Sequence, residues 1–139
     1  MSNKIRARVE GLAVPAVIHT ANLPQDTALK ITGDATVDKS TTVDDKIVGE
    51  LRVPSRTADG QGTVETRFRA LVDAECDGAI AAGDYIKAGD HNSGVQCFKK
   101  WTPLGVSAGP VFTGDLPHLI VGQCWVGGAD TETGTFLLF

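Results

Sequence analysis

Glycine next to aspartate limits what this chain can fold into more than any other feature of its sequence. Such pairs tolerate positive backbone φ angles and form tight turns, and no long apolar stripe with helical spacing lies between them. The pairs stand at 33–34, 59–60, 77–78, 83–84, 89–90 and 114–115. The chain is therefore expected to consist of short strands joined by tight turns.

Apolar and polar residues alternate between these turns with the period of two that is typical of β-strands. We predict one strand over 46–53 and another over 63–72, each with its charged residues facing outward. The predicted core positions are Ile47, Leu51, Val53, Val64, Phe68, Val72, Ile86 and Val121. The sequence thus predicts an all-β fold, a small β-barrel or sandwich of short antiparallel strands with minimal helix.

A weak internal repeat links the two halves of the chain. The motifs "ITGD", "IVGELRV" and "ADGQGTV" return as "FTGD", "IVGQCWV" and "ADTETGTF". The copies occupy 31–34, 47–53 and 58–64, then 112–115, 120–126 and 129–136. We interpret them as two related hairpins packed face to face, each supplying the other's apolar partner; short β-rich sequences also resemble one another by chance.

Length and charge restrict the classes of protein that fit. The 139 residues match one globular domain, which we divide into an N-terminal arm or edge strand over 1–20 and a single β domain over 21–139. A net charge of −4 disfavours nucleic acid as the main partner. The longest apolar run, at 12–18, is too short and too interrupted for a membrane span or a secretory signal.

The residues that carry most enzymatic chemistry are scattered. Three cysteines without paired spacing are expected to be free and buried, in a protein made in a reducing cytoplasm. A zinc site would need four converging ligands, and none of the candidates has paired spacing. These candidates are Cys76, His91, Cys97, His118 and Cys124. We therefore expect no enzyme, with no catalytic residue, no cofactor and no metal.

The stretch "DAECDGAIAAGD" at 73–84 has nearly the spacing of a calcium-binding EF-hand loop. Its flanks are predicted strands, whereas that loop needs helices on both sides, and Asp84 replaces the bidentate glutamate of its last position. We expect two tight turns here. The alternative is an irregular surface site with Asp73, Glu75 and Asp77 on one side of the chain.

Two basic stretches are candidates for binding a partner. "CFKKWTPLG" at 97–105 fits a strand end with solvated lysines and a packed indole better than a base-stacking patch. Near the N-terminus, Lys4, Arg6 and Arg8 alternate with apolar residues. They form either the polar face of an edge strand or a docking arm for an acidic partner.

The segments "IVGELRV", "ADGQGTVETRFRALVDAECDGAIAAGDYIKAG" and "LPHLIVGQCWVGGADTETGTFLLF" resemble the small capsid decoration (cement) proteins of tailed bacteriophages. The resemblance covers 47–139, and the N-terminal third departs from the family. It implies a non-enzymatic virion protein, made in the host cytoplasm, that binds the outer head surface as a homotrimer. It would clamp neighbouring subunits of the major capsid protein, and Lys4, Arg6 and Arg8 are our candidates for capsid contact.

Two other functions are open at this point. One is another phage virion β protein, from the tail or baseplate. The other is a carbohydrate-binding β-sandwich module, in which Tyr85, Trp101 and Trp125 would form an exposed platform for sugar.

Overall fold

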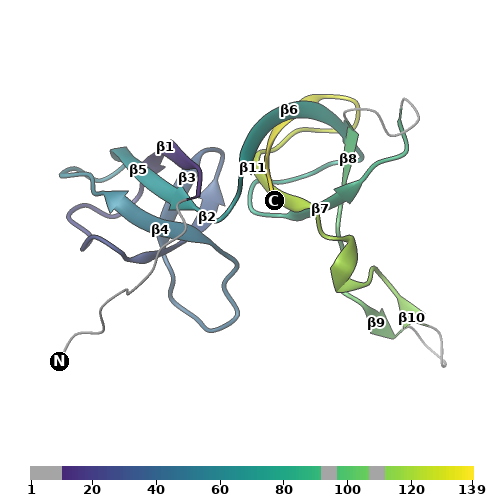
Figure 1. Cartoon of the computed structure of the whole chain (residues 1–139), viewed down its shortest axis with the longest axis horizontal. Helices are drawn as coiled ribbons and strands as arrows, with labels where there is room; N and C mark the ends of the chain where they lie inside the picture. The colour runs from purple at the N-terminus through teal and green to yellow at the C-terminus, as the bar shows by residue number, and fades with distance from the viewer. Residues whose placement is uncertain (1–10, 92–96, 107–111) are drawn as a thin grey trace.

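The computed structural model is all-β, as the sequence predicts, and describes residues 11–91, 97–106 and 112–139. Its strands form two closed five-stranded barrels that lie side by side (Figure 1). A short 3-10 helix, η2 (Pro117–Leu119), precedes the last two strands. Within the described residues, no helix has the length and apolar character needed to cross a membrane.

The strands follow one another along the chain, barrel by barrel. The first barrel consists of β1 (Ala13–Ile18), β2 (Ala28–Gly33), β3 (Thr36–Lys39), β4 (Ile47–Val53) and β5 (Gly60–Thr66). The second consists of β6 (Ala70–Asp77), β7 (Tyr85–Ala88), β8 (Cys97–Lys100), β11 (Gly122–Val126) and β12 (Thr133–Leu138). Between β8 and β11 in sequence, β9 (Gly105–Val106) and β10 (Phe112–Thr113) form a separate two-stranded sheet.

Both barrels have the same topology. In the first, β1 pairs in parallel with β3 and antiparallel with β5, and β2 lies between β3 and β4. In the second, β6 pairs in parallel with β8 and antiparallel with β12, and β7 lies between β8 and β11. The strands β1 to β5 therefore correspond in order to β6, β7, β8, β11 and β12. The repeat is a pair of barrels, and the interpretation as two hairpins packed face to face was wrong.

The glycine of each "IVG" motif occupies the same place in its barrel. Gly49 pairs with Leu29 of β2, and Gly122 pairs with Ile86 of β7. A Cβ atom would lie 2.2 Å from the Glu65 carbonyl oxygen at Gly49 and 2.0 Å from the Leu137 carbonyl oxygen at Gly122. Only glycine allows this close approach of the neighbouring strand, which explains why the motif occurs twice.

One segment of the proposed repeat does not correspond. "FTGD" at 112–115 lies in β10 and the turn after it, whereas "ITGD" at 31–34 ends β2. Because Leu29 and Ile86 pair with equivalent glycines, the true counterpart of 29–34 is "IKAGD" at 86–90. Short turn sequences recur wherever a tight turn is needed, so a four-residue match was a poor guide to correspondence.

The segment 63–72, predicted to be one strand, is divided between two. β5 ends at Thr66 and β6 begins at Ala70, and the residues between them carry the chain from one barrel to the other. Phe68 lies in this junction and is fully buried. The alternation of apolar and polar residues shows which side chains face a core. It does not stop at the junction, because the chain passes from the core of one barrel to the core of the other.

Most of the predicted core positions are correct, and two are wrong. Leu51, Val64, Phe68 and Ile86 are fully buried, while Ile47 and Val72 are partly buried. Val53 is 52% exposed and Val121 is 36% exposed. A β-bulge between Leu51 and Val53 shifts the register against β5, so Val53 faces outward. A second irregularity, in the pairing with β2, lies between Gly49 and Ile47, and Val48 is fully buried there. Val121 precedes β11, outside the alternation of that strand.

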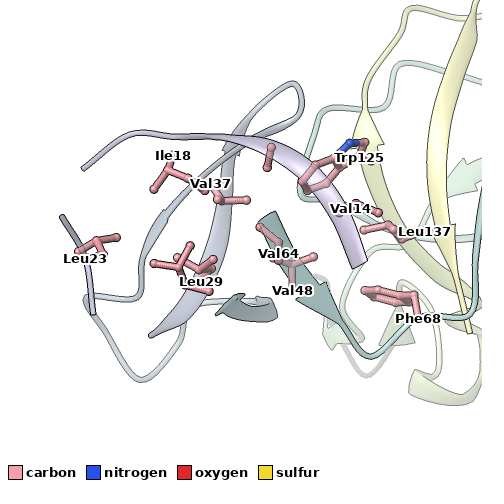
Figure 2. Close-up of a cluster of buried hydrophobic side chains, with 12 residues drawn as sticks. Val14, Ile18, Leu23, Leu29, Val37, Val48, Val64, Phe68, Trp125 and Leu137 are labelled. Atoms are coloured by element: carbon pink, nitrogen blue, oxygen red, sulfur yellow. The ribbon is translucent and has the colours of Figure 1, made fainter. Parts of the chain in front are cut away.

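The core of the first barrel continues into the contact between the barrels. Figure 2 shows Trp125 and Leu137 of the second barrel, with Phe68 of the junction, in one cluster with Val14 and Val64. The Ala35 amide also donates to the Trp125 carbonyl at 3.1 Å, and the Gly127 amide donates to the Asp34 carboxylate at 3.0 Å. The two barrels thus share apolar packing and hydrogen bonds. A separate cluster fills the second barrel: Ala74, Cys76, Ile80, Ile86, Cys124 and Phe136.

Candidate functional site

The basic residues proposed for capsid contact, Lys4, Arg6 and Arg8, lie outside the described residues. Of the segment 1–20, residues 13–18 are β1, which pairs with β5 along its whole length. The described part of this segment is therefore an integral strand of the first barrel. Capsid contact through the first ten residues stays a prediction.

The stretch 73–84 consists of strand and turns. β6 runs to Asp77, and the glycines at 78 and 83 have φ angles of +81° and +91°, which a side chain would strain. The Asp73 carboxylate accepts a hydrogen bond from the Thr135 hydroxyl at 2.8 Å. Asp73 is thus bound to β12, and it is not part of the group that Glu75 and Asp77 form.

Glu75 and Asp77 surround the His91 imidazole together with Asp130. Nδ1 of His91 lies 3.1 Å from Oε1 of Glu75. Nε2 lies 3.2 Å from Oδ1 of Asp77 and 3.8 Å from Oδ1 of Asp130. Among the described residues, Asp77, His91 and Asp130 form the one group with the spacing of metal ligands. The sequence does not reveal this group, because Asp130 stands in the loop between β11 and β12, far along the chain from Asp77 and His91.

The five cysteine and histidine residues considered for zinc are not brought together as a set. Cys76, Cys97 and Cys124 are free and buried, as predicted. Burial raises the pKa of all three thiols, and that of Cys124 rises to about 12. His118 is exposed, in η2.

The three aromatic residues considered for sugar binding do not form one platform. Trp125 is 4% exposed and belongs to the core between the barrels. Tyr85 and Trp101 meet edge to face at 6.2 Å between ring centroids, and the Trp101 Nε1–H donates to the Leu116 carbonyl at 3.0 Å. The prediction of a strand end with a packed indole is confirmed, since β8 ends at Lys100.

A surface feature that the sequence did not reveal lies between β8 and β11. In the first barrel the corresponding strands, β3 and β4, are joined by residues 40–46, whereas 101–121 join β8 and β11. We call the described part of 101–121 the hairpin arm; Figure 1 shows its strands β9 and β10 standing away from the second barrel. Four apolar residues of the arm are exposed to solvent, with exposed fractions of 46% for Leu104, 49% for Leu116, 41% for Leu119 and 36% for Val121.

The base of the hairpin arm is held by Asp115. Its carboxylate accepts a hydrogen bond from Nζ of Lys87 on β7, and others from the Thr102 amide at 2.9 Å and hydroxyl at 3.2 Å. These contacts, with the Lys87 hydrogen bond first, lower the pKa of Asp115. These contacts tie the base of the arm, next to Leu116, to β7 of the second barrel.

A scan of the chain against protein-family models and a search of curated proteins both found no match.

Proposed function

We propose that this chain is a capsid decoration protein, which binds the outer surface of a phage head as a homotrimer and bridges subunits of the major capsid protein. The resemblance of residues 47–139 to that family suggests the function. The observation that carries it is the hairpin arm, which presents exposed leucines from a fixed base. Exposed apolar side chains grouped on a projecting element are typical of a surface that binds another protein.

In this proposal the protein acts by clamping, without chemistry. The barrels give a compact body, and the arm buries Leu116 and Leu119 against a neighbouring subunit. Burial of apolar area contributes about 25 cal/mol per Å², so several arms acting at once hold the capsid against outward pressure from packaged DNA. The loops at 54–62 and 127–134 are further candidates for contact.

Binding to purified heads tests the proposal directly. We expect the protein to co-sediment with expanded, empty heads at saturable occupancy, and to have about three times the chain mass of 14.6 kDa in free solution. A protein that binds purified tails and leaves heads bare would instead be a tail or baseplate component. One that binds neither would contradict the proposal.

A matched pair of variants tests the arm. Leu116→Ser combined with Leu119→Ser removes its exposed leucines, and Val43→Ser removes an apolar side chain that is 100% exposed in the corresponding loop of the first barrel. We expect the first variant to lose head binding and the second to bind like the wild-type protein. Equal binding by both would show that the arm does not contact the capsid.

A further inference from the structure

We propose that His91, Asp77 and Asp130 bind one divalent transition-metal ion at the end of the second barrel. The three side chains come from the end of β6, the loop after β7 and the loop between β11 and β12. Their ligand atoms all lie within 4.8 Å of one another. Ligands held at about 2.0–2.2 Å from one ion lie about 3–3.5 Å apart, so a small closure of the Asp130 loop completes the site.

The surroundings of His91 orient its free ring nitrogen toward the site. Glu75 contacts Nδ1 at 3.1 Å, and a carboxylate there holds the proton on Nδ1 and leaves the lone pair on Nε2. That lone pair then faces oxygens of Asp77 and Asp130, which carry negative charge. A proton on Nε2 can bridge the imidazole to one carboxylate oxygen, whereas a metal ion binds the imidazole nitrogen and both carboxylate oxygens at once. A carboxylate behind a histidine is also the usual second shell of a protein metal site.

The other carboxylate contacts fix the two aspartates in place. The Asp90 amide donates to Oδ2 of Asp77 at 2.9 Å, which leaves Oδ1 directed at His91. The Gly78 amide donates to Oδ1 of Asp130 at 2.7 Å. The same Oδ1 is the Asp130 oxygen that faces His91. A carboxylate oxygen has two lone pairs, so Oδ1 can accept the Gly78 amide and still bind an ion.

The first barrel provides an internal comparison. His19 follows the last residue of β1 and Asp59 precedes β5, at the end of the first barrel that corresponds to the end of the second barrel where Asp77 and Asp130 lie. Nδ1 of His19 lies 2.9 Å from Oδ1 of Asp59, so this barrel has a histidine and an aspartate where the other has two aspartates. The first barrel thus has one carboxylate beside an imidazole at this end, whereas the second has two carboxylates beside His91.

The donor set selects the class of ion. One imidazole with two carboxylates suits Zn²⁺, Co²⁺ or Mn²⁺, whereas Ca²⁺ and Mg²⁺ prefer oxygen ligands alone. Three protein ligands leave positions open for water. We therefore expect the affinity for Zn²⁺ and Co²⁺ to be higher than the affinity for Ca²⁺. The metal affinity should fall in acid, because a protonated imidazole cannot bind metal.

Calorimetric titration with Zn²⁺ and Co²⁺ tests the proposal on the full-length protein without an affinity tag. We expect one ion per chain and a rise of the melting midpoint with added metal. His91→Gln and Asp130→Asn should each weaken binding by about 10- to 100-fold or more. The equivalent changes in the first barrel, His19→Gln and Asp59→Asn, should bind metal like the wild-type protein.

Three results would overturn the proposal. The first is the absence of binding heat with either ion, which would mean that a proton alone bridges His91 to its carboxylates. The second is equal affinity in the wild-type protein and the His91→Gln variant. The third is a thiolate-to-cobalt absorption band, which would place the ion on a cysteine.

Discussion

Lys87 pairs with Asp115 at the base of the hairpin arm, at the position where Lys30 pairs with Asp45 in the first barrel. Lys30 and Lys87 follow the paired residues Leu29 and Ile86 on corresponding strands. Asp45 accepts the Thr41 amide at 2.7 Å and the Thr42 amide at 2.9 Å, as Asp115 accepts Thr102. The same contact thus fixes the start of a seven-residue loop in one barrel and the root of the arm in the other.

We predict that these two aspartates make the fold sensitive to acid. Backbone hydrogen bonds from Thr41 and Thr42 lower the pKa of Asp45, and the Lys87 hydrogen bond lowers that of Asp115. A carboxyl group whose pKa is lower in the folded state stabilises the fold above its unfolded pKa of about 3.9. That contribution disappears as the pH falls through the lowered folded pKa.

Thermal melts of Asp45→Asn and Asp115→Asn between neutral pH and about pH 2 measure this effect. Both variants should melt below the wild-type protein at neutral pH, and the difference should shrink as the wild-type carboxylates become protonated. Asp44→Asn is the control, since Asp44 is exposed next to Asp45. A difference that is constant over the whole range would contradict the assignment.

The ion pair of His19 and Asp59 predicts the opposite dependence on pH. Its hydrogen bond and charge, with a smaller contribution from Asp38, raise the pKa of His19. The pair therefore stabilises the fold below the unfolded pKa of about 6.5, and this is lost as the pH rises through the folded pKa. Because both side chains are exposed, the effect should be small and should vanish in high salt.

Melts of the wild-type protein and Asp59→Asn across pH 5 to about 9, at low and high salt, check this prediction. The variant should be less stable only at the acidic end and only at low salt. Equal loss at both ends of the range would mean that Asp59 stabilises its loop in another way.

Phe68→Ala should lower the free energy of unfolding by about 3–5 kcal/mol, because it leaves a cavity at a fully buried position between the barrels. Denaturant titration measures this loss. The matched control is Phe139→Ala, because Phe139 is 55% exposed and its ring packs against that of Phe68 in a tilted arrangement, with 5.0 Å between ring centroids. The control should cost clearly less. A loss below about 1 kcal/mol for Phe68→Ala would contradict its place in the core.

The three thiols should not react with a thiol reagent in the native protein. Cys76, Cys97 and Cys124 are buried, and the raised pKa of each thiol keeps it protonated at neutral pH. We expect all three to react once the protein is denatured. Fast labelling of Cys124 in the native state would show that the second barrel opens readily.

Deletion of residues 2–10 tests the proposed capsid contact of Lys4, Arg6 and Arg8. Because β1 begins at Ala13, the first barrel keeps all of its strands, and we expect the melting midpoint to be unchanged while head binding is lost. A truncated protein that is stable and still decorates heads fully would leave the hairpin arm and the loops at 54–62 and 127–134 as the candidates. One that is insoluble would show that these residues belong to the barrel.

Local sequence patterns predicted the all-β class and several core positions, because turn chemistry and alternation act over a few residues. Phe68 was placed correctly, although the strand assigned around it is the junction between two barrels. Alternation cannot show which strand a segment pairs with. The groups around His91 were missed for a related reason, since closure of the barrel brings Asp130 to Gly78, next to Asp77, across 52 residues of sequence.

Some of the signal for the site was present in the repeat. Asp59 and Asp130 both follow an alanine, in "ADGQGTV" and "ADTETGTF", and an "IVG" motif stands before each of these segments. An alignment of the halves that included β1 and β6 would have set His19 against Asp77. The spacing between matching residues of the two halves changes along the chain, because β2 contains a bulge and because the connection that forms the hairpin arm is longer than its counterpart. This change in spacing hid the correspondence.

The indole of Trp125 has a mechanical consequence. A force that pulls the two barrels apart must first withdraw this ring from the core of its neighbour and break the backbone contacts of Ala35 and Gly127 at the same time. We therefore expect the two barrels to resist a pulling force as one unit. Tension that enters through one barrel reaches the other without passing through a flexible linker.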